Sequence, residues 1–162
     1  MIELFSRAPE GLTLGEGSHL TPIPLDEAVS SLSAILLDDD DYAFIVAGRR
    51  EVEGCSYVGE DRLIPLKARA WLELDARRAQ GAPLDSRDVR KHANDVLRLS
   101  QLLAATSIIP VSEKLAGDLA AFIAGIAGDA TIDAQTLGIR SSVNDICARL
   151  ALAYDLAGTP DT

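Results

Sequence analysis

The spacing of apolar positions along the chain changes near Gly59. Before this residue, short apolar runs alternate with breaks that contain Gly and Pro, which is typical of short strands joined by loops. These runs lie at residues 1–6, 12–17, 20–25, 31–37 and 50–58. Residues 38–48 begin with four aspartates and continue with apolar positions. They predict a helix between the last two runs, because carboxylates favour a helix N-terminus.

After Gly59 the apolar spacing approaches the 3.6-residue period of an amphipathic helix. Four helices are predicted, at residues 60–81, 85–105, 111–128 and 142–158. The expected N-caps are Asp85 or Ser86, then Ser112, then Ser142 with Asp145 in capping-box spacing. The pattern predicts an α+β fold in one domain, residues 1–162, with a small N-terminal sheet (1–58) followed by a C-terminal helical bundle (59–162).

The last two predicted helices have apolar faces that we expect to cover the helix at 85–105. One face carries Leu115, Leu119, Phe122 and Ile126, and the other carries Ile146, Leu150 and Tyr154. Small Ala and Gly residues lie between these positions and allow close helix packing. We therefore expect these two helices to be structural.

Composition narrows the classes of protein that the chain can belong to. Its 162 residues are 48% hydrophobic, enough for a folded core, and no apolar run has the length of a membrane span. The N-terminal segment lacks the features of a signal peptide, so we expect a cytoplasmic protein with no membrane partner. Both cysteines, Cys55 and Cys147, are expected to be reduced and buried. A net charge of −10 repels phosphate at long range, and no feature points directly to nucleic acid.

The helix predicted at 85–105 carries a polar stripe beside its apolar face. Asp88, His92 and Asp95 share one face of this helix, because residues three and four apart are neighbours. Lys91 lies within reach of both aspartates. The histidine is therefore either part of a site wall or a boundary residue that makes local hydrogen bonds.

Lys67 interrupts the apolar stripe of the helix predicted at 60–81. The stripe itself consists of Leu63, Ala70 and Leu74. A lysine in this slot either extends its ammonium to the surface or points into a polar cleft, toward a carboxylate of this chain or a ligand phosphate. We expect it to lie on the same cleft as His92 and Asp95, and we expect Trp71, one turn on, to belong to the core.

Three segments together carry a resemblance to a known family: "MIELFS", "LIPLKARAWLELDARR" and "DSRDVRKHANDVLRLSQLL". Over residues 1–104 the chain resembles the second half of bacterial proteins related to abortive-infection nucleotidyltransferase toxins, within the DNA polymerase β-like nucleotidyltransferase superfamily. The resemblance implies Glu3, on the strand "IELF", as a metal ligand and Mg²⁺ as the cofactor. The catalytic residues that it implies are Lys67, Lys91, His92 and Asp95.

The chain departs from that superfamily at its catalytic elements. Members hold the triphosphate with a Gly-Ser loop and two metal ions with an Asp-x-Asp pair, and both elements should precede Glu3. Only two residues do. "GEGS", with His19 beside it, is typical of a loop, and Asp38 and Asp40 are typical of a helix start. The chain is thus expected to be a fragment, a product of a misassigned start, or a member without its catalytic half.

Two functions remain open from the sequence. The first is a partial nucleotidyltransferase-like domain that is inactive alone, because one carboxylate cannot hold two metal ions, and that keeps a phosphate- or nucleotide-binding corner at Lys67, Lys91 and His92. The alternative is a non-catalytic interaction or oligomerisation module, either a homo-oligomer or one half of a toxin–antitoxin pair.

Overall fold

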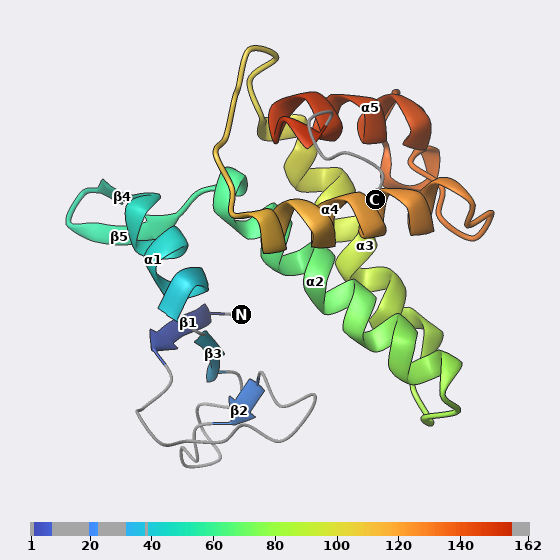
Figure 1. Ribbon diagram of the computed structural model, residues 1–162, viewed down its shortest axis with the longest axis horizontal. Helices are drawn as coiled ribbons and strands as arrows, with labels where there is room; N and C mark the ends of the chain where they lie inside the picture. The colour runs from blue at the N-terminus through green and yellow to red at the C-terminus, as the bar shows by residue number, and fades with distance from the viewer. Residues whose placement is uncertain (1, 8–19, 23–31, 38, 157–162) are drawn as a thin grey trace. The chain divides into compact units, whose positions relative to one another are not determined.

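The computed structural model describes residues 2–7, 20–22, 32–37 and 39–156, with side chains from residue 39 on (Figure 1). The chain divides into two compact units, Met1–Tyr57 and Val58–Thr162. The first contains a small sheet and the second contains most of the helices, so the predicted α+β fold is confirmed. The single-domain organisation stays a prediction.

A three-stranded sheet in the first unit has β3 (Leu32–Leu37) at its centre. β1 (Ile2–Arg7) pairs with β3 in parallel, with Glu3 opposite Ser33, and β2 (Leu20–Pro22) pairs with it in antiparallel. Strands therefore form at the predicted runs 1–6, 20–25 and 31–37, and β1 extends one residue beyond its run, to Arg7. The run predicted at 12–17 lies outside the described residues.

The acidic run begins a helix, as predicted. α1 (Asp39–Ala47) has three aspartates in its first turn, where their charge interacts favourably with the helix N-terminus. Asp39 and Asp40 are exposed, whereas Asp41 is buried. Asp40 is thus helical, as expected for a helix start, and Asp38 lies outside the described residues.

A β-hairpin follows α1, and all of it except its last residue, Val58, belongs to the first unit. β4 (Arg49–Val52) and β5 (Cys55–Val58) are joined by Glu53 and Gly54, which both have positive φ (51° and 79°). Positive φ at both central residues is the conformation that two-residue hairpins favour. Cys55 lies in this hairpin and is exposed, so the prediction that both cysteines are buried is wrong for Cys55 and confirmed for Cys147.

The second unit is a bundle of helices whose starts are fixed by local capping. Its elements are α2 (Glu60–Ala79), α3 (Ser86–Leu99), η1 (Ser100–Leu102), α4 (Glu113–Ala127), η2 (Gln135–Leu137) and α5 (Val143–Ala153). Asp85 accepts from Arg87 N at 2.8 Å, and Ser112 caps α4. The predicted capping box of Ser142 and Asp145 is present. The helix predicted at 85–105 ends earlier, at Leu99, and continues as the short η1 turn.

One apolar core joins the helices of the second unit. Trp71 of α2 meets Phe122 of α4 edge to face, with ring centroids 5.4 Å apart. A Cβ added at Gly125 would lie 2.6 Å from a Trp71 ring carbon, so the glycine allows this close approach. Trp71 is a core residue, as predicted. All seven apolar positions predicted for α4 and α5 are buried: Leu115, Leu119, Phe122, Ile126, Ile146, Leu150 and Tyr154.

The packing partner of α4 differs from the one predicted. α4 lies mainly against α2, and α5 packs on α4 (Figure 1). The sequence pattern predicts instead that α4 and α5 cover α3. The apolar stripe of a helix shows which side is buried but does not show which helix buries it. The Trp71–Phe122 contact fixes this choice in the structure.

A proline inside α2 leaves one backbone carbonyl without its usual partner. Pro65 has no N–H to donate to the carbonyl oxygen of Asp61, four residues before it. The hydroxyl of Tyr154 donates to this oxygen at 2.8 Å. Tyr154 is buried at the end of α5, and this burial raises the pKa of its phenol well above the ordinary value. The hydroxyl is therefore protonated at neutral pH and donates this bond.

Candidate functional site

Lys67, on α2, lies beside α3. Its Nζ is 3.8 Å from Asp95 Oδ2, and its side chain is only 16% exposed. Lys67 therefore points toward Asp95 of α3 and not into solvent, as the sequence predicts, whereas the cleft that it was expected to share with His92 stays a prediction. Asp95 Oδ1 also lies 3.9 Å from Arg98 Nη1. The carboxylate is thus shared by a cation from α2 and a cation from its own helix.

The other residues predicted for this group lie near Asp95 to different degrees. His92 is partly buried, one turn before Asp95 on α3. Lys91 is exposed, and within the described part of the chain it forms an ion pair with neither Asp88 nor Asp95. The structure therefore pairs Lys67 with Asp95, places His92 partly buried on the same helix as Asp95, and leaves Lys91 exposed. The assignment of these four residues as catalytic stays a prediction.

The predicted metal site gains no support from the described residues. Glu3 lies on β1, as expected, but its side chain is outside what the structure describes. Gly17, Ser18 and His19 also lie outside. From residue 39 to 156, no three His, Cys, Asp or Glu side chains are grouped closely enough to hold a metal ion. The described residues thus do not form the carboxylate cluster that Mg²⁺-dependent transfer needs, and we assign no step to Mg²⁺.

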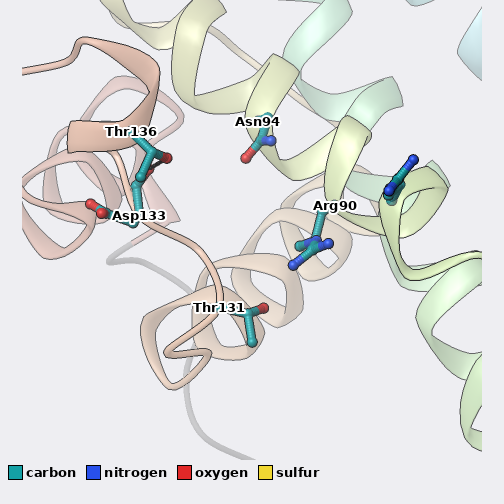
Figure 2. A pocket seen from close by; sticks show the side chains of 6 residues that line it. Arg90, Asn94, Thr131, Asp133 and Thr136 are labelled. Atoms are coloured by element: carbon teal, nitrogen blue, oxygen red, sulfur yellow. Dashed lines mark hydrogen bonds between the residues drawn. The ribbon is translucent and has the colours of Figure 1, made fainter.

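A different group of polar residues forms a surface hollow of about 390 Å³ in the second unit (Figure 2). One wall belongs to α3, and the other belongs to the loop that joins α4 to α5, including η2. We call it the α3 hollow, and its lining residues are Arg87, Arg90, Asn94, Thr131, Asp133 and Thr136.

Helical spacing explains the α3 wall. Arg87, Arg90 and Asn94 follow one another at intervals of three and four residues and share one face. Val89 and Ala93 lie on the neighbouring face of α3, which is buried. Packing the apolar face against the core therefore presents the two arginines and the amide outward.

Alternating burial explains the loop wall. Ile132, Ala134 and Ile139 are buried in the core, whereas Thr131 and Asp133 are exposed. The apolar side chains anchor the loop to the bundle. Its polar side chains consequently face outward beside α3 at a fixed place.

Hydrogen bonds within the loop wall determine what its side chains can offer. The Thr131 hydroxyl donates to Asp129 Oδ1 at 2.7 Å, and the Thr136 hydroxyl donates to the Asp133 carbonyl at 2.8 Å. Both hydroxyl hydrogens are thus engaged, and the oxygens remain acceptors. The Asp133 carboxylate accepts from Gln135 N at 2.9 Å and, in Figure 2, points away from Arg90.

The hollow is electrostatically mixed. In the described part of the chain, the side chains of Arg87 and Arg90 form no ion pair. The pKa of the Asp129 carboxyl is lowered, chiefly by the hydrogen bond from the Thr131 hydroxyl and less by the nearby charges of Arg78 and Arg90, while burial opposes this shift. Asp129 is therefore ionised at neutral pH and partly offsets Arg90.

The helical spacing of the residues in the α3 wall is visible in the sequence, but the predicted polar stripe did not include them. Arg87, Arg90 and Asn94 line the side of the helix next to the stripe of Asp88, His92 and Asp95. No comparable signal placed the α4–α5 loop beside them, because that contact is tertiary.

Comparisons with protein-family models, with curated proteins and with solved structures find no match to this chain. The resemblance to nucleotidyltransferase-related proteins therefore stays a prediction. Within the described residues, no helix combines the length and the apolar character needed to cross a membrane.

Proposed function

We propose that this chain is a non-catalytic module that binds a phosphate-bearing ligand through the exposed face of α3. One observation carries the proposal: Arg87, Arg90 and Lys91 are close together on α3, and among the described residues none of the three forms an ion pair. Guanidinium groups match the geometry of phosphate oxygens, and an ammonium adds a point charge.

The distribution of charge supports anion binding by the second unit. Residues 1–57 contain 3 basic and 11 acidic residues, whereas residues 58–162 contain 12 basic and 14 acidic residues. Most of the net charge of −10 thus belongs to the first unit. The second unit is nearly neutral, and its cations are concentrated on a few helix faces.

Catalysis is not part of the proposal, because Lys67, the lysine that would carry it, has a structural partner. Lys67 forms its ion pair with Asp95 between α2 and α3. A lysine that stabilises a helix interface in this way is not positioned as a phosphate ligand. The proposal therefore keeps phosphate binding from the nucleotidyltransferase-like hypothesis, assigns it to α3, and leaves out catalysis.

Calorimetric titration of the full chain with ATP tests the proposal. We expect a dissociation constant on the order of 1 mM, or about −4 kcal/mol, that weakens as salt concentration rises. The triple variant Arg87→Gln, Arg90→Gln, Lys91→Gln should not bind, and Lys67→Met should bind like the wild type. Salt-independent binding, or loss of binding in Lys67→Met with the fold intact, would refute the proposal.

A transfer assay tests the non-catalytic part. The chain is incubated with labelled nucleoside triphosphates, Mg²⁺ or Mn²⁺ and candidate acceptors, including itself, and we expect no label transfer. Transfer that disappears in the Asp38→Asn, Asp40→Asn variant would show that the acidic run is catalytic.

One observation favours the alternative function of a self-associating module. Ile109 N donates to the Ala153 carbonyl at 2.8 Å, which brings the loop after η1 to the end of α5. The neighbouring Ile108 and Leu152 are 79% and 76% exposed. Sedimentation equilibrium of the wild type and Leu152→Asp distinguishes the two functions: a dimer that dissociates in the variant would support self-association.

A further inference from the structure

We propose that the α3 hollow is the binding site and that its ligand is a phosphate monoester of a hydroxylated, non-aromatic compound. This inference rests on the proposed function and narrows it to one place and one ligand class. It follows from the different hydrogen-bonding character of the two walls.

The α3 wall supplies donors. Arg87 and Arg90 lie one turn apart and each carries a guanidinium group, and Asn94 adds an amide NH₂ one turn further on. The phosphate of a doubly ionised monoester presents acceptors only, and a planar guanidinium can engage two of its oxygens at once. The helix N-terminus is not the anchor here, because Asp85 already accepts from Arg87 N at 2.8 Å.

The loop wall supplies acceptors. The hydroxyl oxygens of Thr131 and Thr136 have their hydrogens engaged with Asp129 and the Asp133 carbonyl. What they can still accept is a hydrogen bond from a ligand hydroxyl. A compound with phosphate at one end and hydroxyl groups at the other therefore complements both walls, whereas inorganic phosphate complements only the α3 wall.

The hollow is large enough for a small molecule, and its lining contains no aromatic ring on which a nucleotide base could stack. A volume of about 390 Å³ lies within the range of small-molecule sites. None of the six lining residues is aromatic, and all are polar or charged. A nucleotide base would find no ring on which to stack, so a base should add nothing to the affinity of a sugar phosphate.

Asp129 limits the affinity of the site. Its carboxylate lies near Arg90, and the charge of Arg90 contributes to the lowered pKa of Asp129. The Asp129 carboxylate accepts from the lining residue Thr131 at 2.7 Å, so its negative charge repels a phosphate held in the hollow. Asp129→Asn removes the competing charge while keeping an oxygen that can accept from Thr131, so it should bind phosphate compounds severalfold more tightly.

The test compares four probes on the full chain by calorimetry: ribose 5-phosphate, AMP, inorganic phosphate and ribose. We expect ribose 5-phosphate and AMP to bind within twofold of each other, phosphate to bind severalfold more weakly, and ribose not to bind. AMP binding tenfold more tightly than ribose 5-phosphate would overturn the ligand class.

Variants locate the site. Arg90→Gln should weaken ribose 5-phosphate binding at least tenfold, and Thr136→Val should reduce it to the level of inorganic phosphate without changing phosphate binding itself. The matched control on α3 is Arg98→Gln, because Arg98 is exposed and lies outside the hollow, and this variant should bind within twofold of wild type. Circular dichroism confirms that each variant is folded.

The outcomes separate the two proposals. If Arg90→Gln binds ribose 5-phosphate normally and Lys91→Gln does not, phosphate binds to α3 outside the hollow. The hollow is then not the binding site, but the proposed function stands. If no phosphate compound, ATP included, binds the wild-type chain, both proposals fall.

Discussion

Tyr154 is predicted to stabilise the bundle because it bonds the carbonyl that Pro65 leaves without its usual partner. Tyr154→Phe keeps the buried ring and removes only the hydroxyl, whose 2.8 Å bond to the Asp61 carbonyl is then lost. Pro65 has no N–H with which to replace it. An unsatisfied buried acceptor costs about 1–3 kcal/mol, and the bond to Asp61 is partly buried, so Tyr154→Phe should lower the free energy of unfolding by up to about 2 kcal/mol.

A double-mutant cycle with Pro65→Ala isolates this effect. The alanine introduced by this substitution would supply an N–H to the Asp61 carbonyl, as in an ordinary helix. In that background Tyr154→Phe no longer leaves the acceptor unsatisfied, and its effect should fall below about 1 kcal/mol. We therefore expect a coupling free energy of about 1–2 kcal/mol between the two positions.

Urea unfolding followed by tryptophan fluorescence measures the cycle. The chain has one tryptophan, Trp71, which lies in the core of the second unit and so reports the unfolding of that unit. Tyr57→Phe is the control, because Tyr57 is 45% exposed and its loss of a hydroxyl should change nothing. Equal losses from Tyr154→Phe in the wild-type and Pro65→Ala backgrounds would refute the reasoning.

Two further predictions concern packing and acid stability. Gly125→Ala places a Cβ 2.6 Å from the Trp71 ring and should destabilise the protein by about 1–3 kcal/mol. Gly117→Ala places a Cβ with no atom within 4 Å and should stabilise the protein by up to about 1 kcal/mol. Thermal unfolding of both variants checks this, and stability changes of the same sign would contradict it. The pKa values of Asp129 and Asp145 are lowered in the folded state, mainly by hydrogen bonds from Thr131 and Ser142. The two carboxylates stabilise the folded state fully above the unfolded pKa of about 4, and this stabilisation is lost as pH falls through the folded pKa values. The variant Asp129→Asn, Asp145→Asn should therefore lose less stability below about pH 4 than the wild type. A pH profile of stability equal to that of the wild type would contradict this.

Local features of the fold could be predicted because they depend on neighbouring residues. Ser112 and the pair of Ser142 and Asp145 were expected at helix starts, and all three cap their helices. The acidic run was expected to start a helix, and α1 begins at Asp39. In each case the side chain bonds or interacts with backbone within four residues, so the sequence alone contains both partners.

Features that join distant segments could not be predicted from these patterns. The bond from Tyr154 to Asp61 spans 93 positions, and nothing near Pro65 indicates which side chain will satisfy its missing partner. The choice of α2 and not α3 as the neighbour of α4 depends on how Trp71 and Phe122 fit together. Lys67 is the intermediate case, because its slot in the apolar stripe showed the direction of its ammonium and left its partner open.

The α3 hollow shows how a site can follow from packing without a motif. The bundle buries Val89 and Ala93 on one face of α3, and Arg87 and Arg90 lie on the neighbouring face outside the core. It also buries Ile132, Ala134 and Ile139 of the next loop, which holds Thr131 and Thr136 beside them. Because buried apolar side chains fix both walls, the hollow exists before any ligand arrives. Such preorganisation reduces the entropy lost on binding, so a small polar hollow with only two arginines can still hold a sugar phosphate selectively.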